Sequence, residues 1–289
     1  MSDILSTMIF LLINGLVIGF IITLVALGLT LIFGVMRIVN MAHGDLYMMG
    51  AVISYFVLSF GGNFFISLFT APILVFAISY LIERFVVRPF EGNPTNTMLV
   101  TLGLSFIIQQ VTLITYGGVP RVIPEPWTLS FQMFGAQYSG YRLAVAIISA
   151  TILSGLWSFL HRTTYGTFIR ATIQDAEVAC ATGINTNRIF TFTFALGGTL
   201  AALGGVLAAP ITQVFYLMGN NVILIAFIIV IVGGLGSFKG TLIIALLLSI
   251  LEGTLTIFLR PVEVRIISLM VMVLTLLLRP SGLFGRRYR

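Results

Sequence analysis

Charged side chains are scarce in this chain. They make up 8% of its 289 residues, whereas hydrophobic residues make up 58%. Soluble domains contain about 25% charged and roughly 45–50% apolar residues. So few charges cannot cover the surface of a soluble fold, and the chain is therefore predicted to lie in lipid.

Cysteine and histidine are almost absent. Cys180 is the single cysteine, which excludes an internal disulfide, and His43 and His161 are the two histidines. These residues do not form a recognisable zinc-ligand pattern, so we predict no metal site. Taken alone, Cys180 is interpreted as a small buried thiol in a helix.

Sequence patterns of catalysis and nucleotide binding are also missing. The chain has neither a Gly-x-x-x-x-Gly-Lys-Ser/Thr loop nor a Gly-x-Ser-x-Gly turn. Its formal net charge of +6 comes from basic residues that are scattered near the ends of apolar runs and form no patch. We predict that the chain is no enzyme, binds no cofactor itself and has no nucleic-acid partner.

Long apolar runs dominate what is present. A helix needs about 20 residues to cross a hydrocarbon core of about 30 Å. Runs of this kind lie at 8–30, 46–61, 64–86, 96–116, 140–160, 188–210, 221–237, 241–259 and 264–279. The prediction is an all-α integral membrane protein, a polytopic bundle of about 8–9 transmembrane helices in one domain, 1–289.

Basic residues indicate which segments face the cytoplasm. With alternating spans, most of them fall on one side, as the positive-inside rule requires. They are Arg84, Arg88, Arg162, Arg170, Arg188, Lys239, Arg279, Arg286, Arg287 and Arg289, with Arg121, Arg142, Arg260 and Arg265 as exceptions. The loop 161–188 and the C-terminus are then cytoplasmic, nine spans place the N-terminus outside, and 117–140 is predicted to be an ordered external loop.

Two stretches interrupt the helical pattern. Residues 34–45 contain Gly34 and Gly44, and residues 233–240 contain Gly233, Gly234 and Gly236. Irregular backbone at membrane depth survives only where protein buries it or where it lines water. One interpretation is one or two broken or re-entrant segments at these glycines, and the other is a pair of ordinary interfacial loops.

Few polar groups fall inside the predicted spans, and these are candidates for a translocation pathway. They are Asn40, His43, Asp45 and Glu252. Glu252 lies near the middle of its span, either on the pathway or as a structural group, protonated or paired with Arg37 or His43. Asp45 either caps a helix end or lies where a helix N-terminus faces a substrate carboxylate.

The loop 161–188 is the one long polar stretch of the chain. On a helix, Ala176, Ala179, Cys180 and Gly183 fall at i, i+3, i+4 and i+7, beside Glu177. Such a stripe of small residues lets a partner approach the backbone closely. A second stripe, Gly197, Ala201, Gly205 and Ala209, predicts close helix packing, either within the bundle or in a dimer.

Four segments together resemble the branched-chain amino acid permease family of ABC importers. They are residues 33–34, 40–51 (Asn-Met-Ala-His-Gly-Asp-Leu-Tyr-Met-Met-Gly-Ala), 233–240 (Gly-Gly-Leu-Gly-Ser-Phe-Lys-Gly) and 279–285 (Arg-Pro-Ser-Gly-Leu-Phe-Gly). Residues 170–185 resemble the family's coupling loop, with Val178 where the family usually has Ala. Met41 and Asp45 stand where the family usually has Phe and Glu.

The resemblance implies a permease subunit in a bacterial inner membrane, forming half of a translocation pathway. It implies a sister permease or a second copy, two ATP-binding subunits that hydrolyse ATP, and an extracytoplasmic solute-binding protein. The coupling residues would be Ala176, Glu177, Ala179, Cys180 and Gly183. The implied solutes are branched-chain amino acids, although relatives that import urea or short amides share the same segments.

A proton-coupled secondary transporter is the main alternative. In that interpretation Glu252, His43 and Asp45 relay a proton and no ATPase is needed. The energy source of uptake distinguishes the two hypotheses.

Overall fold

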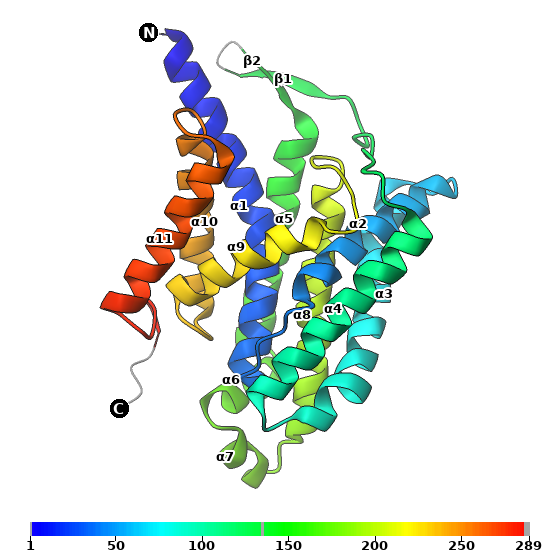
Figure 1. Ribbon diagram of the computed structural model, residues 1–289, viewed down its shortest axis with the longest axis vertical. Helices are drawn as coiled ribbons and strands as arrows, with labels where there is room; N and C mark the ends of the chain where they lie inside the picture. The colour runs from blue at the N-terminus through cyan, green and yellow to red at the C-terminus, as the bar shows by residue number, and fades with distance from the viewer. Residues whose placement is uncertain (1, 134–135, 286–289) are drawn as a thin grey trace.

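The computed structural model of the protein describes residues 2–133 and 136–285. These residues form eleven α-helices and a two-stranded antiparallel hairpin (Figure 1). The helices are α1 (Ser2–Met36), α2 (His43–Ser59), α3 (Phe64–Ile82), α4 (Pro94–Tyr116), α5 (Gly140–Arg162), α6 (Thr164–Gln174), α7 (Ala176–Ala181), α8 (Thr186–Ala208), α9 (Met218–Gly233), α10 (Phe238–Leu255) and α11 (Pro261–Leu278). A π-turn, η1 (Glu83–Val87), and a 3-10 turn, η2 (Arg88–Phe90), follow α3.

Each of the nine predicted apolar runs coincides with a helix. Seven of the helices in the described residues are long and apolar enough to cross a membrane. The other two runs became α2, with 17 residues, and α9, with 16 residues. At about 1.5 Å per residue both are shorter than a bilayer core of about 30 Å. The prediction of a polytopic all-α membrane protein is confirmed.

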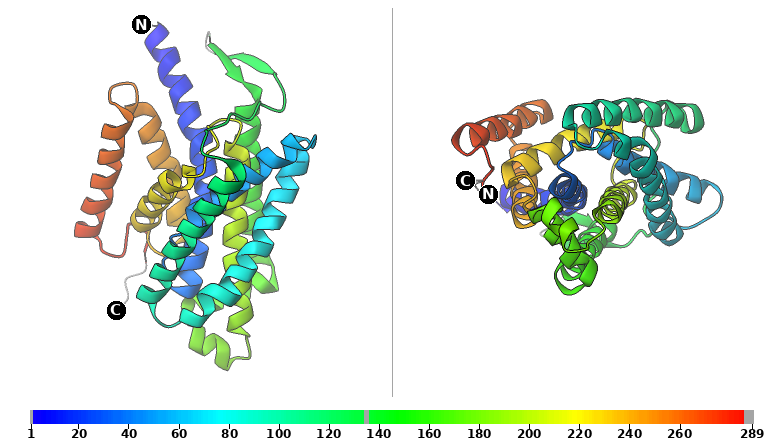
Figure 2. Two further views of the ribbon diagram at one scale, coloured as in Figure 1. Left: turned by 45° about the vertical axis from the view of Figure 1, so that its right-hand side comes forward. Right: turned by 90° about the horizontal axis from the view of Figure 1, so that it is seen from below.

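The helices α1 and α8 lie at the centre of the bundle. α1 packs against α5, α8, α9 and α10, whereas α8 also packs against α2 and α3. Seen from below in Figure 2, α4 and α11 lie at the edges. A methyl group added at Gly28 of α1 would lie only 2.5 Å from the carbonyl oxygen of Gly197 in α8. The small-residue stripe of α8 is therefore buried within this chain, where it lets helix backbones touch.

The first predicted interruption lies between α1 and α2, at residues 37–42. Gly34 and Gly44, predicted as break positions, lie within α1 and in the first turn of α2 instead. His43 contacts the carbonyl oxygen of Val25 at 2.9 Å. Val25 lies eleven residues before the end of α1, about 16 Å along its axis. The segment 37–42 thus returns into the bundle, and α2 begins beside the middle of the α1 span Met8–Met36.

The second interruption lies at the predicted glycines. Gly233 is the last residue of α9, and Gly234 and Gly236 adopt positive φ angles of 102° and 78°. The C-terminal segment folds back onto this turn, because the N–H groups of Leu283 and Phe284 donate to the carbonyl oxygens of Val232 and Gly233 at 2.9 and 3.2 Å. The turn is therefore enclosed by the chain's own tail.

The two ends of the bundle differ. The N-terminus and the hairpin β1 (Ser130–Met133) and β2 (Ala136–Ser139) lie at one end, and α6 and α7 lie at the other (Figure 1). In the hairpin Phe131 pairs with Tyr138. The predicted external loop 117–140 is thus partly a β-hairpin. The alternation of polar and apolar residues over 130–133 is too short to predict one.

Candidate functional site

The loop between α5 and α8 folds into two short helices that project from one end of the bundle. Asp175 separates them: its carboxylate accepts hydrogen bonds from the N–H groups of Glu177 and Val178 at 2.9 and 3.0 Å, which starts α7. α6 packs against α1 and α8, so the projection has a firm base. The structure therefore forms the predicted loop as an ordered helical element.

The exposed face of α7 differs from the predicted small-residue stripe. Ala179 is buried and faces the protein, whereas Glu177, Val178 and Cys180 are exposed. Gly183 lies beyond the helix with a φ of 92°, a left-handed conformation that often ends a helix. Its N–H donates to the carbonyl oxygen of Cys180 at 3.0 Å. The stripe therefore does not run along one helix face, and the interpretation of Cys180 as a buried thiol is wrong. Ala176 is half-buried at the start of α7.

Gly34, near the end of α1, lies between α6 of this projection and the turn between α9 and α10. A methyl group added there would lie 3.3 Å from the Cα of Gly236 and 3.6 Å from the Cδ1 of Ile173. Gly236 belongs to the turn between α9 and α10, and Ile173 belongs to α6. Two glycine stretches far apart in the sequence thus meet, and α6 contacts the first of them at Gly34.

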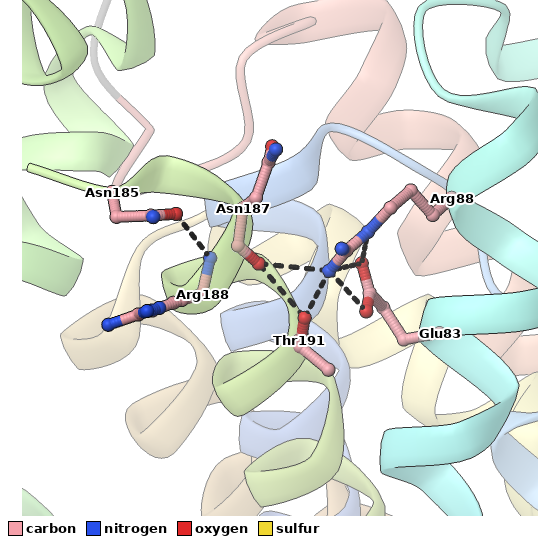
Figure 3. Close-up of polar contacts among 6 residues, drawn as sticks. All are labelled: Glu83, Arg88, Asn185, Asn187, Arg188 and Thr191. Atoms are coloured by element: carbon pink, nitrogen blue, oxygen red, sulfur yellow. Dashed lines mark hydrogen bonds and ion pairs between the residues drawn. The ribbon is translucent and has the colours of Figure 1, made fainter.

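A buried ion pair holds α3 to the start of α8, directly after the projection (Figure 3). Glu83 is fully buried, and Arg88 donates to both of its carboxylate oxygens, at 3.2 and 3.0 Å. The same guanidinium donates to the carbonyl oxygen of Asn187 at 3.1 Å and to the hydroxyl of Thr191. Asn185 caps α8 by accepting from the N–H of Arg188. This arrangement fixes the position at which α8 begins.

Glu91 lies outside the spans, in the turn after η2. Burial raises the pKa of its carboxyl group above the usual value, and repulsion from Glu83 raises it further. One of its oxygens is buried without a hydrogen-bond partner among the described residues. The protonated form of Glu91 is therefore favoured relative to a solvent-exposed glutamate.

Helix α4 supplies two hydrogen bonds to the backbone of the segment 37–42. The hydroxyl of Thr101, which is fully buried, accepts from the N–H of Met41 at 3.2 Å, and its single proton is shared between the carbonyl oxygens of Val39 at 3.3 Å and Met98 at 3.0 Å. Asn40 accepts from the N–H of Ala42 at 3.1 Å, and its amide nitrogen has no partner among the described residues. Non-helical backbone inside the membrane is thus satisfied by side chains.

Asn40, His43 and Asp45 lie together where α2 begins, and all are buried. His43 reaches the backbone of α1, and its Nδ1 has no partner in the described part of the chain. The carboxylate of Asp45 accepts from the amide of Gln109 in α4 at 3.0 Å. The same amide lies 3.1 Å from the side-chain oxygen of Asn220 in α9. Three helices therefore contribute to one polar cluster at mid-depth.

The inner face of α4 is polar along its whole length. Its buried residues recur at nearly every fourth position and are all hydroxyl or amide side chains: Thr97, Thr101, Ser105, Gln109, Thr112 and Tyr116. Its exposed face is apolar, as at Leu99 and Ile107. These residues were not predicted from the sequence, although polar residues that recur with a period of four in an apolar run indicate a buried polar face.

Glu252 lies apart from that cluster. It pairs with Arg265 at 3.4 Å and accepts from the hydroxyl of Ser268 at 2.6 Å, not from Arg37 or His43. Its neighbour Gly253 packs on Gly15 of α1. That position is ten residues before Val25, about 15 Å along the helix. The pair is half-buried and borders a cleft of about 280 Å³ between α1, α10 and α11.

These observations define a multi-pass α-helical membrane protein with two broken segments, an interior polar track and a helical projection at one end. The family of permease components of branched-chain amino acid transport systems has a model that matches residues 11–277. The chain belongs to this family. Because its relatives are transport permeases, it is a transport subunit, as predicted.

Two curated relatives match along nearly their whole length. The high-affinity branched-chain amino acid transport system permease protein BraD of Pseudomonas aeruginosa is 28% identical and covers 95% of each chain. LivH of Escherichia coli (strain K12), of the same description, is 28% identical and covers 94% of each chain. A solved structure, PsaBC from Streptococcus pneumoniae in complex with Fab, has a TM-score of 0.52 at 14% identity. It covers 93% of this chain and 91% of that one, and shows the fold alone.

Proposed function

We propose that this chain is the membrane-spanning permease subunit of an ATP-driven importer for branched-chain amino acids. The observation that carries the proposal is the match to the permease family over residues 11–277, with both termini of the match at predicted spans. The chain forms one permease domain, 1–289, and provides half of the translocation pathway. It works in the inner membrane with a sister permease or a second copy, two ATP-binding subunits and an extracytoplasmic solute-binding protein.

The projection α6–α7 serves as the coupling element in this proposal. Basic residues support placing it in the cytoplasm: Arg162 ends α5 directly before α6, Arg88 binds the start of α8 directly after α7, and Arg84 lies in η1, which packs against α8. The C-terminus is then cytoplasmic as well, and the hairpin end faces the solute-binding protein. α7 presents Glu177 and Val178, with Val178 59% exposed at its tip. An exposed apolar side chain beside a charge suits a docking surface.

The contacts of α6 supply a route from this surface to the interior. When ATP binding moves the ATPases, α7 moves with them, and α6 pushes through Ile173 on Gly34 of α1, which in turn lies against Gly236 of the α9–α10 turn. The Glu83–Arg88 pair keeps α8 fixed to α3 during that motion. The broken segments between α1 and α2 and between α9 and α10 then change position relative to the central helices.

Reconstitution tests the proposal directly. The chain is purified with its neighbouring ATPase, sister permease and solute-binding protein, and placed in vesicles. Leucine, isoleucine and valine should stimulate ATP hydrolysis and accumulate in the vesicles when ATP is supplied to the ATPase side. Urea and short amides serve as the competing solutes. Uptake that ignores ATP and disappears with an uncoupler would instead establish the proton-coupled transporter.

A paired substitution tests the coupling surface. Val178→Arg should release the ATPase subunits during purification, because it replaces the exposed apolar side chain of the docking surface with a long, positively charged one. Val122→Arg is the matched control, since Val122 is 67% exposed in the segment between α4 and β1, and that segment leads to the hairpin end of the bundle (Figure 1). Retention of the ATPases and of uptake by Val178→Arg would remove α7 from the coupling surface and leave the transport function standing.

A further inference from the structure

Three oxygen atoms from three helices converge on one amide nitrogen inside the bundle. The Nε2 atom of Gln109 lies 3.0 Å from the Asp45 carboxylate, 3.0 Å from the Ser105 hydroxyl oxygen and 3.1 Å from the Asn220 side-chain oxygen. Asp45 is 1% exposed, Ser105 5% and Gln109 6%. The cluster is therefore desolvated on all sides except at Asn220, which is exposed.

The nitrogen of Gln109 has more acceptors around it than hydrogens to donate, whereas the Ser105 hydroxyl brings a proton of its own and hydrogen-bonds to Asp45. A glutamine amide nitrogen carries two hydrogens, so it cannot serve three acceptors at once. Turning the amide over would place its oxygen there and add a fourth acceptor. A primary ammonium group carries three hydrogens and a positive charge, and it satisfies all three oxygens. The geometry around Nε2 thus matches an ammonium group better than the amide that occupies it.

The charge of Asp45 points to the same ligand. A carboxylate inside a membrane protein is costly unless a cation or several donors compensate it. Asp45 accepts hydrogen bonds from Gln109 and Ser105, but no cation pairs with it: the ion pairs that the structure shows within 2–133 and 136–285 are Glu83–Arg88 and Glu252–Arg265. A cationic solute would provide the missing positive charge.

The position of the cluster gives a solute access to it. Asn220 begins α9 beside α2, because a methyl group added at Gly219 would lie 2.4 Å from the carbonyl oxygen of Gly44. Asn220 and Asn221 are thus exposed near mid-depth, where polar side chains avoid lipid. This face therefore suits a wet pathway, and the polar stripe of α4 extends from the cluster toward both ends, from Thr97 to Tyr116.

We propose that Asp45, Ser105 and Asn220 bind the ammonium group of the transported solute, and that Gln109 occupies their site when no solute is present. Arrival of the solute displaces the Gln109 amide, and departure lets it return. This inference rests on the proposed function, since it names the part of an amino acid that the pathway recognises.

Charge-selective thiol labelling tests the site without requiring transport. Asn220→Cys is made in the assembled complex with Cys180→Ser as background. It is treated with 2-aminoethyl methanethiosulfonate, which is cationic, and with 2-sulfonatoethyl methanethiosulfonate, which is anionic. Rates are normalised to Val122→Cys at the outer end. The cationic reagent should be favoured by about tenfold or more, because the Asp45 carboxylate attracts it, and Asp45→Asn should remove the preference. Equal normalised rates with Asp45 present would overturn the inference.

Uptake provides the second measurement. Asp45→Asn should reduce leucine uptake by about tenfold or more in vesicles, since a charged hydrogen bond is lost, and Asp45→Glu should restore part of it. Glu263→Gln, a carboxylate-to-amide change at the exposed start of α11, should leave uptake unchanged. Uptake by Asp45→Asn within twofold of the parent would also overturn the inference. A charge preference at Asn220→Cys in a complex that takes up no amino acid would instead overturn the proposed function and leave a cation-attracting site at Asp45.

Discussion

α1 and α4 both cross the membrane, and they bury opposite kinds of surface. α1 is the central helix, and 78% of its most apolar window is buried in a close-packed, mainly aliphatic core. α4 lies at the edge with 28% of its window buried, and its buried residues are hydroxyls and amides. Apolar side chains gain little by leaving lipid for protein, so burial alone does not mark the core of a membrane protein. α1 therefore organises the packing of the bundle, whereas α4 provides hydrogen-bond partners for buried polar groups.

The largest expected effect tests the packing role of α1. Gly28→Leu should abolish the folded subunit, because its first side-chain carbon would lie 2.5 Å from the Gly197 carbonyl oxygen and overpacking of this kind costs about 3 kcal/mol or more. Gly103→Leu on α4 is the matched control, since nothing lies within 4 Å of an added methyl group there. The measurement is the yield of monodisperse complex in detergent. Equal yields for the two variants would contradict the difference drawn between these helices.

The next effect tests the ion pair between Glu83 and Arg88, in the turns that connect α3 to α4. Arg88→Leu leaves the buried Glu83 carboxylate without its cation, which costs about 3 kcal/mol for a partly exposed arginine. The expected result is a clear drop in the unfolding temperature of the subunit. Arg84→Leu, an exposed arginine on the same turn, is the control. Adding Glu83→Gln to Arg88→Leu should recover part of the loss, and no recovery would show that the carboxylate is not the cause.

A smaller effect isolates one hydroxyl of α4. Thr101→Val keeps the side-chain shape and removes the hydrogen bonds to Met41 and Val39, so we expect a loss of about 1–3 kcal/mol of stability. Thr115→Val, on the exposed face of the same helix, should change stability much less. Thermal unfolding of both variants in the same detergent measures the difference. If Thr101→Val unfolds at the parent temperature, the polar face of α4 does not hold the segment 37–42.

The smallest effect concerns pH. The folded state holds the Glu91 proton more tightly than the unfolded state, because burial raises the pKa of its carboxyl group. Between the ordinary glutamate pKa and this raised value the folded state binds more protons, so its stability falls as pH rises and then levels off. Glu91→Gln should remove this dependence and unfold at a higher temperature than the parent at neutral pH. A parent curve that rises with pH through that window would reverse the assignment.

The sequence predicted the parts of the structure that depend on local composition. Long apolar runs predicted the helices, and positive φ at Gly234 and Gly236 matches a glycine-rich turn. The break at 37–42 was placed only approximately, because its course is set by Thr101, some 60 residues away. Of the Asp45–Gln109–Asn220 cluster, only Asp45 was predicted from the sequence. Asp45 is conspicuous as a charge in an apolar run, whereas glutamine and asparagine gain meaning only when three helices meet.

Coupling residues show the same limit. Asp175 and Gly183 start and end α7 through local hydrogen bonds, which sequence spacing describes well. The spacing did not reveal that Ala179 faces inward, because that depends on how α7 lies against α8. The Glu252–Arg265 pair was likewise missed, since its two residues belong to helices that fold back on each other at the α10–α11 corner.

The extended segment 37–42 also constrains how the chain is made. Its backbone receives hydrogen bonds from Thr101, which leaves the ribosome some 60 residues later. Until then these peptide groups cannot enter hydrocarbon without a large penalty. During synthesis, α2 must therefore wait in a hydrated or protein-lined place, and its final insertion follows the arrival of α4.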